Sequence, residues 1–80
     1  MRLDKFLKVS RIIKRREVAN EAADKGRIIL NDKQAKASTP VKVGDIIEIK
    51  FGDKISKYRI LKVLENPKKE ESYEMVEEVK

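Results

Sequence analysis

Apolar residues recur every three or four positions near the start of the chain. This stripe predicts an amphipathic helix over residues 2–12. It consists of Leu3, Phe6 and Leu7, and continues in Ser10 and Ile13. A narrower stripe of small side chains predicts a second helix that begins at Arg15 or Arg16 and ends before Gly26, a favourable C-terminal stop. Its apolar positions are Val18, Ala19, Ala22 and Ala23.

After the second helix the pattern changes to short runs and alternations that are typical of strands. Residues 28–30 form a β-branched run, and the Asn31-Asp32 pair predicts a tight hairpin turn that returns the chain along residues 34–36. Residues 46–51 and 55–64 predict two longer strands. The order predicts an α+β fold, with two N-terminal helices packed on a small, mostly antiparallel sheet of about four to five strands.

The last part of the chain has a different composition. Residues 66–72 are rich in Lys, Glu and Ser, which predicts a loop. Tyr73, Met75 and Val76 follow, and they fit either an edge strand or a short helix.

Composition excludes most classes of enzyme. The chain has 80 residues, enough for one domain, and it contains no Cys and no His. Disulfides, thiolate or imidazole metal sites, Cys nucleophiles and histidine acid–base catalysis are therefore excluded. We expect no enzymatic activity, no cofactor and no metal site. No apolar run approaches the length of a membrane span or a signal peptide, so we expect a cytoplasmic protein with no membrane partner.

Charge is distributed unevenly along the chain, whose net charge is +6. Residues 1–16 contain seven cations and one anion, whereas residues 65–80 contain three cations and six anions. A solvated helix face is the ordinary explanation of such cations. Lys14, Arg15 and Arg16 are consecutive, however, and no acid precedes them closely, so we favour a surface that binds the phosphates of a polyanion.

Two further features bear on the ligand. Asp4 either compensates the dipole of the first helix or orients an arginine, namely Arg2 or one from the second helix. Phe6 and Phe51 are expected in the core, which argues against recognition of single strands by base stacking. Structured RNA, recognised by its shape and phosphate positions, fits better, and charge alone does not exclude DNA.

Several motifs in order resemble the S4 RNA-binding domain, a family named after small-subunit ribosomal protein four. They are Arg2-Leu3-Asp4-Lys5-Phe6-Leu7, Arg11, Lys14-Arg15-Arg16, Ala19, Gly26-Arg27-Ile28, Asn31, Lys36-Ala37-Ser38 and Val41-Lys42-Val43-Gly44-Asp45. The resemblance extends over residues 2–49 and implies RNA binding by the two helices and the adjoining hairpin. It divides the chain into an RNA-binding domain of S4 type, residues 1–64, and an acidic C-terminal segment, residues 65–80.

Among members that stand alone, the chain is most similar to factors of ribosome-associated quality control, and more distantly to the ribosome-associated heat-shock protein. The first resemblance implies binding to the large ribosomal subunit, through its ribosomal RNA and a peptidyl-tRNA, after a stalled ribosome splits. It also implies help to a partner protein that adds a C-terminal alanine tail. A heat-shock or assembly factor on free large subunits, and a basic module that binds an acidic protein, are the alternatives.

The resemblance also implies which residues contact RNA. Together with Lys5 on the outer face of the first helix, the predicted RNA-binding residues are Arg2, Arg11, Lys14, Arg15, Arg16, Lys36 and Ser38, with Asp4 as an orienting residue. Two departures from the family pattern stand out. Arg15 replaces the usual Ser or Thr cap of the second helix, and Asn31-Asp32 replaces the usual Asn-Gly of the hairpin, which leaves the turn type open.

Overall fold

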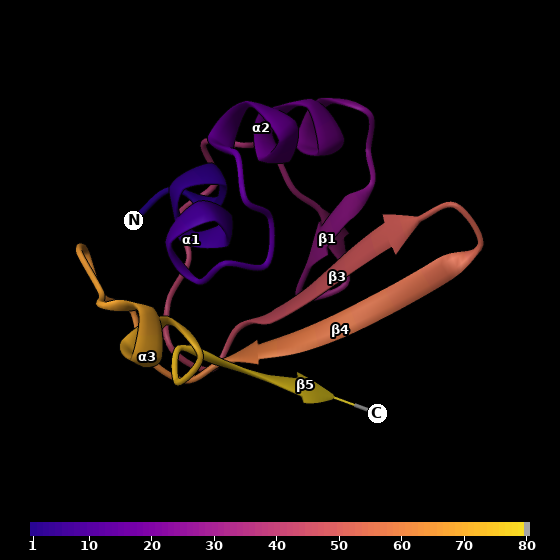
Figure 1. Ribbon diagram of the computed structural model, residues 1–80. Coiled ribbons are helices and arrows are strands. Elements are labelled where there is room, and N and C mark those ends of the chain that lie inside the picture. The colour runs from indigo at the N-terminus through magenta and orange to yellow at the C-terminus, as the bar shows by residue number, and fades with distance from the viewer. Residues whose placement is uncertain (80) are drawn as a thin grey trace.

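A computed structural model describes residues 1–79 as two helices packed on one side of a five-stranded antiparallel sheet (Figure 1). The sheet order is β2-β1-β3-β4-β5. The elements are α1 (Leu3–Val9), α2 (Arg16–Asp24), β1 (Ile28–Leu30), β2 (Lys33–Gln34), β3 (Ile46–Phe51), β4 (Lys54–Ile60), α3 (Lys69–Ser72) and β5 (Val76–Val79). The predicted α+β fold is therefore confirmed.

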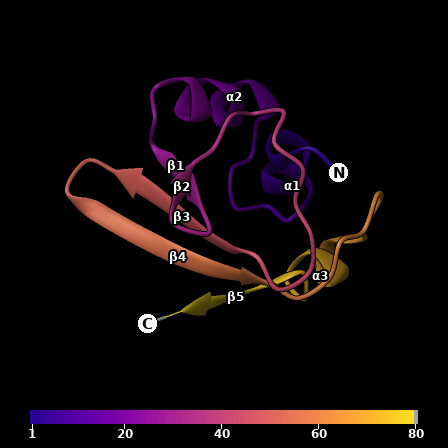
Figure 2. The same cartoon turned by 180° about the vertical axis from the view of Figure 1, so that it is seen from behind.

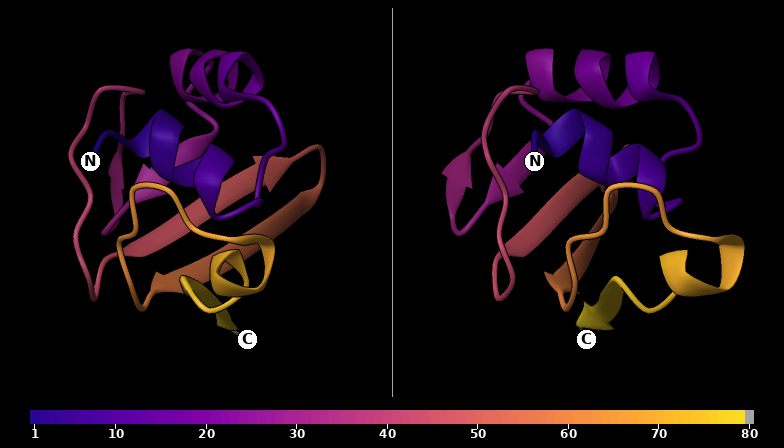
Figure 3. Two further views of the ribbon diagram at one scale, coloured as in Figure 1. Left: turned by 60° about the vertical axis from the view of Figure 1, so that its left-hand side comes forward. Right: turned by 90° about the vertical axis from the view of Figure 1, so that its left-hand side faces the viewer.

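The core lies between the helices and the sheet. α1 crosses the sheet and α2 packs beside it (Figure 3). The apolar stripe of α1 is fully buried, and the alanines of α2 allow the two helices to approach closely. The largest apolar side chains without solvent exposure are Leu3, Phe6, Leu7, Ile28, Ile47, Ile49 and Met75.

The first helix ends at Val9, three residues earlier than predicted. Arg11 adopts a left-handed backbone conformation with φ of 64°, and its N–H donates to the carbonyl of Lys8 at 3.0 Å. The N–H of Ile13 then donates back to Leu7 at 3.1 Å, so the apolar stripe continues into the core without a further helical turn. Periodicity alone does not reveal this stop, because glycine is the residue that usually marks it.

The second helix has the boundaries that the sequence predicted. Its end is a Schellman motif, in which Gly26 has φ of 72° and the N–H groups of Gly26 and Arg27 donate to Ala23 and Ala22. At its start, Arg15 is the N-cap and provides no side-chain cap. The acidic Glu17 in the first turn compensates the helix dipole instead.

The hairpin between β1 and β2 is a two-residue turn. Asn31 and Asp32 have φ of 50° and 68°, the combination of a type I′ turn, which settles the turn type that the sequence left open. Leu30 therefore pairs with Lys33, and β2 covers residues 33–34, so the predicted return strand over 34–36 was displaced.

The C-terminal part departs further from the prediction. β4 ends at Ile60 and not at residue 64, because its partner β3 begins only at Ile46 and the N–H groups of Leu61 and Lys62 both donate to Met75. Lys69–Ser72 form the short helix α3 where a loop was predicted. A carboxylate oxygen of Glu71 accepts the N–H of Lys68 at 3.0 Å and caps this helix. Val76–Val79 then form the edge strand β5 against β4.

Phe51 does not belong to the core, so its predicted burial was wrong. Its side chain is 49% exposed. Phe51 shares the helix-covered face with Ile47 and Ile49, as the alternation requires. The β3–β4 hairpin projects beyond α2, however, and no helix covers its end (Figure 1).

Candidate nucleic-acid interface

The N-terminus is held in place by the segment that joins β2 to β3, which runs alongside α1 (Figure 2). The N–H of Leu3 donates to Thr39 at 2.9 Å, and Arg2 forms a β-bridge with Pro40. The segment is itself stabilised by a turn in which the hydroxyl of Thr39 accepts the N–H of Lys36. These contacts fix the backbone of Arg2 at the start of α1.

Asp4 is the centre of a cluster that joins α1 to α2. Its side chain is only 2% exposed, and its two oxygens accept from both Arg2 and Arg16. Arg2 Nε lies 3.3 Å from Oδ1, and Arg16 Nε lies 3.2 Å from Oδ2. The N–H of Lys5 donates to Oδ1 at 2.8 Å, and Asn20 Nδ2 lies 3.4 Å from Oδ2. We call Arg2, Asp4 and Arg16 the arginine site.

The environment keeps Asp4 ionised. Burial raises the pKa of the Asp4 carboxyl group. The hydrogen bond from Arg16, the N–H of Lys5 and the charges of Arg16 and Arg2 together outweigh burial, so the pKa of Asp4 lies below its ordinary value of 3.8. At neutral pH a carboxylate therefore holds both guanidinium groups.

The arginine site keeps unused donors that face solvent. The side chains of Arg2 and Arg16 are 52% and 45% exposed, and each guanidinium has five N–H donors in a planar fork. Only some of these donors contact Asp4, and the three charges sum to one positive charge. Two oriented forks with a net positive charge are suited to the oxygens of a phosphate group.

The surroundings decide on which side such a phosphate fits. Arg2 also lines an open depression of about 370 Å³ together with Lys36 and Ser38, both exposed in the segment after β2. The flank of α2 is acidic, because Glu17, Glu21 and Asp24 line the neighbouring hollow. The depression toward Lys36 and Ser38 contains one carboxylate, that of Asp24, whereas the hollow along α2 contains Glu17 and Glu21 as well, so a phosphate fits better on the side of Lys36 and Ser38.

The other predicted site residues lie elsewhere. Lys5 points toward the C-terminal part, where its ammonium forms an ion pair with Glu65, and the hydrogen bond from Lys5 lowers the pKa of Glu65. Arg15 is exposed at the N-cap of α2. Arg11 and Lys14 lie beyond the other end of α1. The fold therefore separates Arg11 and Lys14 from the predicted residues at and beside the arginine site, which are Arg2, Arg16, Lys36 and Ser38.

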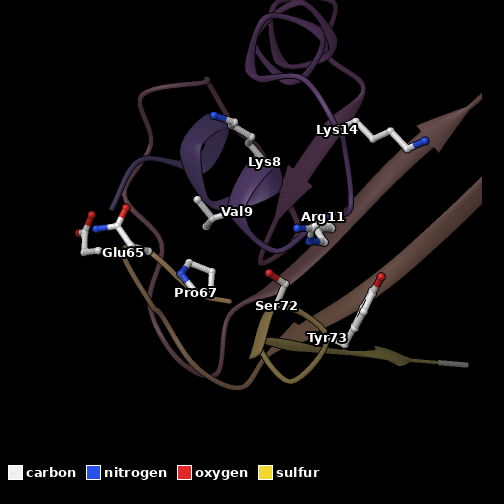
Figure 4. Close-up of a pocket in the computed structure, with 9 residues that line it drawn as sticks. Lys8, Val9, Arg11, Lys14, Glu65, Pro67, Ser72 and Tyr73 are labelled. Carbon is white, nitrogen blue, oxygen red and sulfur yellow. The ribbon is translucent and has the colours of Figure 1, made fainter. Parts of the chain in front are cut away.

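Arg11 and Lys14 line an open groove of about 600 Å³ between the α1–α2 connection and the α3 segment (Figure 4). We call it the basic groove and define it by Lys8, Arg11, Lys14 and Tyr73. Figure 4 shows Lys8 and Lys14 above Arg11, and Ser72 and Tyr73 below it on the side of α3. Glu65, Asn66 and Pro67 complete the wall.

Three residues of these two surfaces were absent from the predicted set. Asn20 follows Arg16 by four positions, which places both on one side of α2, so helical spacing identifies it. Lys8 follows Lys5 by three positions on α1, so helical spacing identifies it in the same way. No sequence pattern identifies Tyr73, because only the return of the chain past α1 brings it to the groove.

Residues 1–79 contain no group of three or more acidic, Cys or His side chains that is arranged to hold a metal ion. Within the same range, each helix is too short or too polar to cross a membrane.

Comparisons with known proteins agree with this fold. A family model described as the S4 domain matches residues 1–47. A protein of Streptococcus pneumoniae named RQC P-site tRNA stabilizing factor is 53% identical over 83 residues, which cover 100% of this chain and 94% of the relative. A protein of the same name from Listeria innocua is 57% identical over 75 residues, or 94% of this chain and 82% of the relative.

A solved structure shares the whole fold. The trimeric Heat Shock Protein 15 of Vibrio cholerae superimposes with a TM-score of 0.88 at 28% identity, and the match covers 99% of this chain and 81% of that one.

Proposed function

The chain belongs to the S4 domain family, and from this premise we propose that its arginine site binds the phosphate backbone of structured RNA. The observation that carries the proposal is the pair of guanidinium groups held by the buried Asp4. All three residues fall within the matched residues 1–47. Arg15, Lys36 and Ser38 extend the contact around this centre, and Lys5 joins it when RNA competes with Glu65.

The RNA is that of the large ribosomal subunit, together with the tRNA in its P site. The name shared by the relatives from Streptococcus and Listeria, RQC P-site tRNA stabilizing factor, supports this assignment. The relative from Streptococcus is 53% identical and its match covers the whole of this chain. The protein acts in ribosome-associated quality control, and therefore in the cytoplasm, on large subunits that retain a peptidyl-tRNA after a stalled ribosome has split.

The mechanism is positional and requires no catalysis. Oriented arginines neutralise phosphates of two RNA segments and hold them in one arrangement, while the release of counterions contributes affinity. A peptidyl-tRNA held in this way stays available to the partner protein that adds C-terminal alanine. The carboxylates of the acidic C-terminal segment repel phosphates, so in this proposal they contribute no contact to RNA.

The similarity to Heat Shock Protein 15 supports a second candidate, a factor that binds free large subunits without a role in alanine tailing. The two candidates differ in the tRNA content of the subunits that the protein binds. A third candidate, a basic module for an acidic protein, differs in its ligand and lacks the steep salt dependence of RNA binding.

Sedimentation of the tagged protein from a lysate on a sucrose gradient, with tRNA probed in every fraction, separates these candidates. Co-migration with large subunits that retain tRNA is the expected result, and migration with tRNA-free subunits would favour the second candidate. Arg16→Ala should weaken binding by about 1 to 3 kcal/mol, as the loss of a charge-assisted phosphate contact does. Lys54→Ala removes the same charge from the distant β3–β4 hairpin and serves as the control. Unchanged co-sedimentation of Arg16→Ala would contradict the proposal.

A further inference from the structure

The basic groove contains cations that form no ion pair within residues 1–79. Lys8, Arg11 and Lys14 are all exposed, and none of them contacts a carboxylate in the described part of the chain. Clustered cations repel each other, and an anion in the groove removes that repulsion. The positive charge of the groove is therefore available to a ligand.

Three carboxylates of the C-terminal part, those of Glu65, Glu71 and Glu74, are engaged elsewhere. Glu65 lines the groove but is paired with Lys5. Glu71 accepts the N–H of Lys68, and Glu74 lies 3.5 Å from the ammonium of Lys62. The groove is thus basic although it borders the acidic end of the chain.

Arg11 occupies a position that favours glycine. Its φ of 64° ends α1 at the place where a left-handed residue is required. The described structure gives its side chain no hydrogen bond or ion pair that would offset this strained backbone. A conformational penalty without a folding contact indicates that the guanidinium serves binding.

Tyr73 adds a flat aromatic surface at the edge of the groove. It is 61% exposed, whereas the other tyrosine, Tyr58, is partly buried against the core. Its backbone is fixed, because it follows the capped helix α3 and precedes the buried Met75. An exposed, fixed ring beside several cations is the arrangement that binds single-stranded nucleic acid, in which a base stacks while its phosphates meet positive charges.

We propose that the basic groove is a second RNA site, which holds an unpaired nucleotide with its base on the ring of Tyr73 and its flanking phosphates on Arg11, Lys14 and Lys8. The site lies partly outside residues 1–47, because Tyr73 comes from the C-terminal segment. The proposal rests on the proposed RNA-binding function and specifies the kind of RNA that this end of α1 accepts. An acidic peptide would use the cations without requiring the ring.

The absence of Trp makes a direct assay possible. In a Tyr58→Phe background, Tyr73 is the single tyrosine, and stacking of a base on it quenches its emission. Titration with hexauridylate, a short single-stranded RNA, should quench this emission, with absorption by the RNA corrected. Hexaglutamate is the competing probe, and binding of hexaglutamate as tight as that of the RNA would overturn the choice of ligand.

Variants test the two halves of the site by anisotropy of labelled hexauridylate. Tyr73→Ala should weaken binding about 5- to 100-fold, while Tyr73→Phe, which keeps the ring, should retain it. Arg11→Gly should weaken RNA binding without lowering the melting temperature, because glycine adopts the left-handed conformation at no steric cost. Lys33→Ala removes one charge on the far β1–β2 hairpin and controls for net charge.

Binding of the parent protein to large subunits, measured beside these titrations, distinguishes this inference from the proposed function. If Tyr73→Ala binds hexauridylate as the parent does, the second site is refuted, and binding of large subunits by the parent still supports the first. If the parent protein binds no subunits, the proposed function fails. Lower stability of Arg11→Gly would overturn the argument that Arg11 is retained for binding.

Discussion

Replacing Asp4 by Asn separates orientation from charge at the arginine site. Asn has nearly the same shape, and its carbonyl oxygen can still accept the N–H of Lys5, now at 2.8 Å from Oδ1. Its NH2 group then faces donors of Arg16 and Asn20, where the carboxylate has an oxygen. The two guanidinium groups lose the anion that orients them, although the net charge of the protein rises by one.

Two opposing effects set the size of the change in RNA binding. One extra positive charge about 7 Å from a phosphate contributes about 0.6 kcal/mol in water, and less after salt screening. A fixed arginine loses up to about 2 kcal/mol of side-chain freedom, and Asp4 has already ordered two such side chains. Because Arg2 and Arg16 are about half exposed, we assign half of that value to each. Binding should therefore weaken by about 1 to 2 kcal/mol, or roughly 5- to 30-fold in Kd.

The assay is the Kd for isolated large subunits, measured by co-sedimentation at two salt concentrations. Asp53→Asn is the matched control, because it makes the same charge change in the exposed turn between β3 and β4. Arg16→Lys keeps the charge but loses the planar fork, and it should also weaken binding. Thermal melts establish a temperature at which every variant is folded. If Asp4→Asn binds as tightly as Asp53→Asn, orientation by Asp4 is not the basis of affinity.

Three further predictions concern stability. Phe6→Ala removes a fully buried ring and should cost about 3 to 5 kcal/mol, so a thermal melt like that of the parent would contradict its place in the core. Asp32→Gly should raise the free energy of unfolding by about 0.5 kcal/mol in urea titrations, because Asp32 has φ of 68° in a type I′ turn; Asp53→Gly, which relieves no positive φ, should not. The pKa of Asp4 is lower in the folded state, so its carboxylate stabilises the fold fully above about pH 3.8, and this contribution is lost as the pH falls through the folded value. The stability difference between the parent and Asp4→Asn should shrink in that acid range, and a constant difference would contradict the pKa shift.

The sequence predicted correctly those elements that neighbouring residues determine. The stripe of α1, the glycine after α2 and the hairpin pair Asn31-Asp32 all appear in neighbouring residues, and the structure has an element at each. The errors occurred where an unusual backbone conformation or distant packing decides the structure. α1 ends early because Arg11 takes a conformation that its residue type disfavours, and Phe51 is exposed because the helices do not extend over the end of β3.

The candidate site was predictable to a similar extent. Charge density identified the cations of α1 and the start of α2, but not how the fold divides them. The pairing of Lys5 with Glu65 joins residues 60 positions apart, and no local pattern contains it. Tyr73 reaches the basic groove by the same return of the chain, and no local pattern in the sequence places it beside Arg11.

The dimensions of α1 connect the two surfaces. The helix has seven residues and is therefore about 10 Å long, with Arg2 before its start and Arg11 after its end. The arginine site offers rigid forks, which suit the fixed phosphate spacing of a paired stem, whereas the basic groove offers a ring that only an unstacked base can cover. A stem that passes directly into an unpaired nucleotide presents both features within such a distance. If both sites act together, the ligand is a junction between paired and unpaired RNA, and neither a continuous duplex nor a free single strand satisfies both ends of α1.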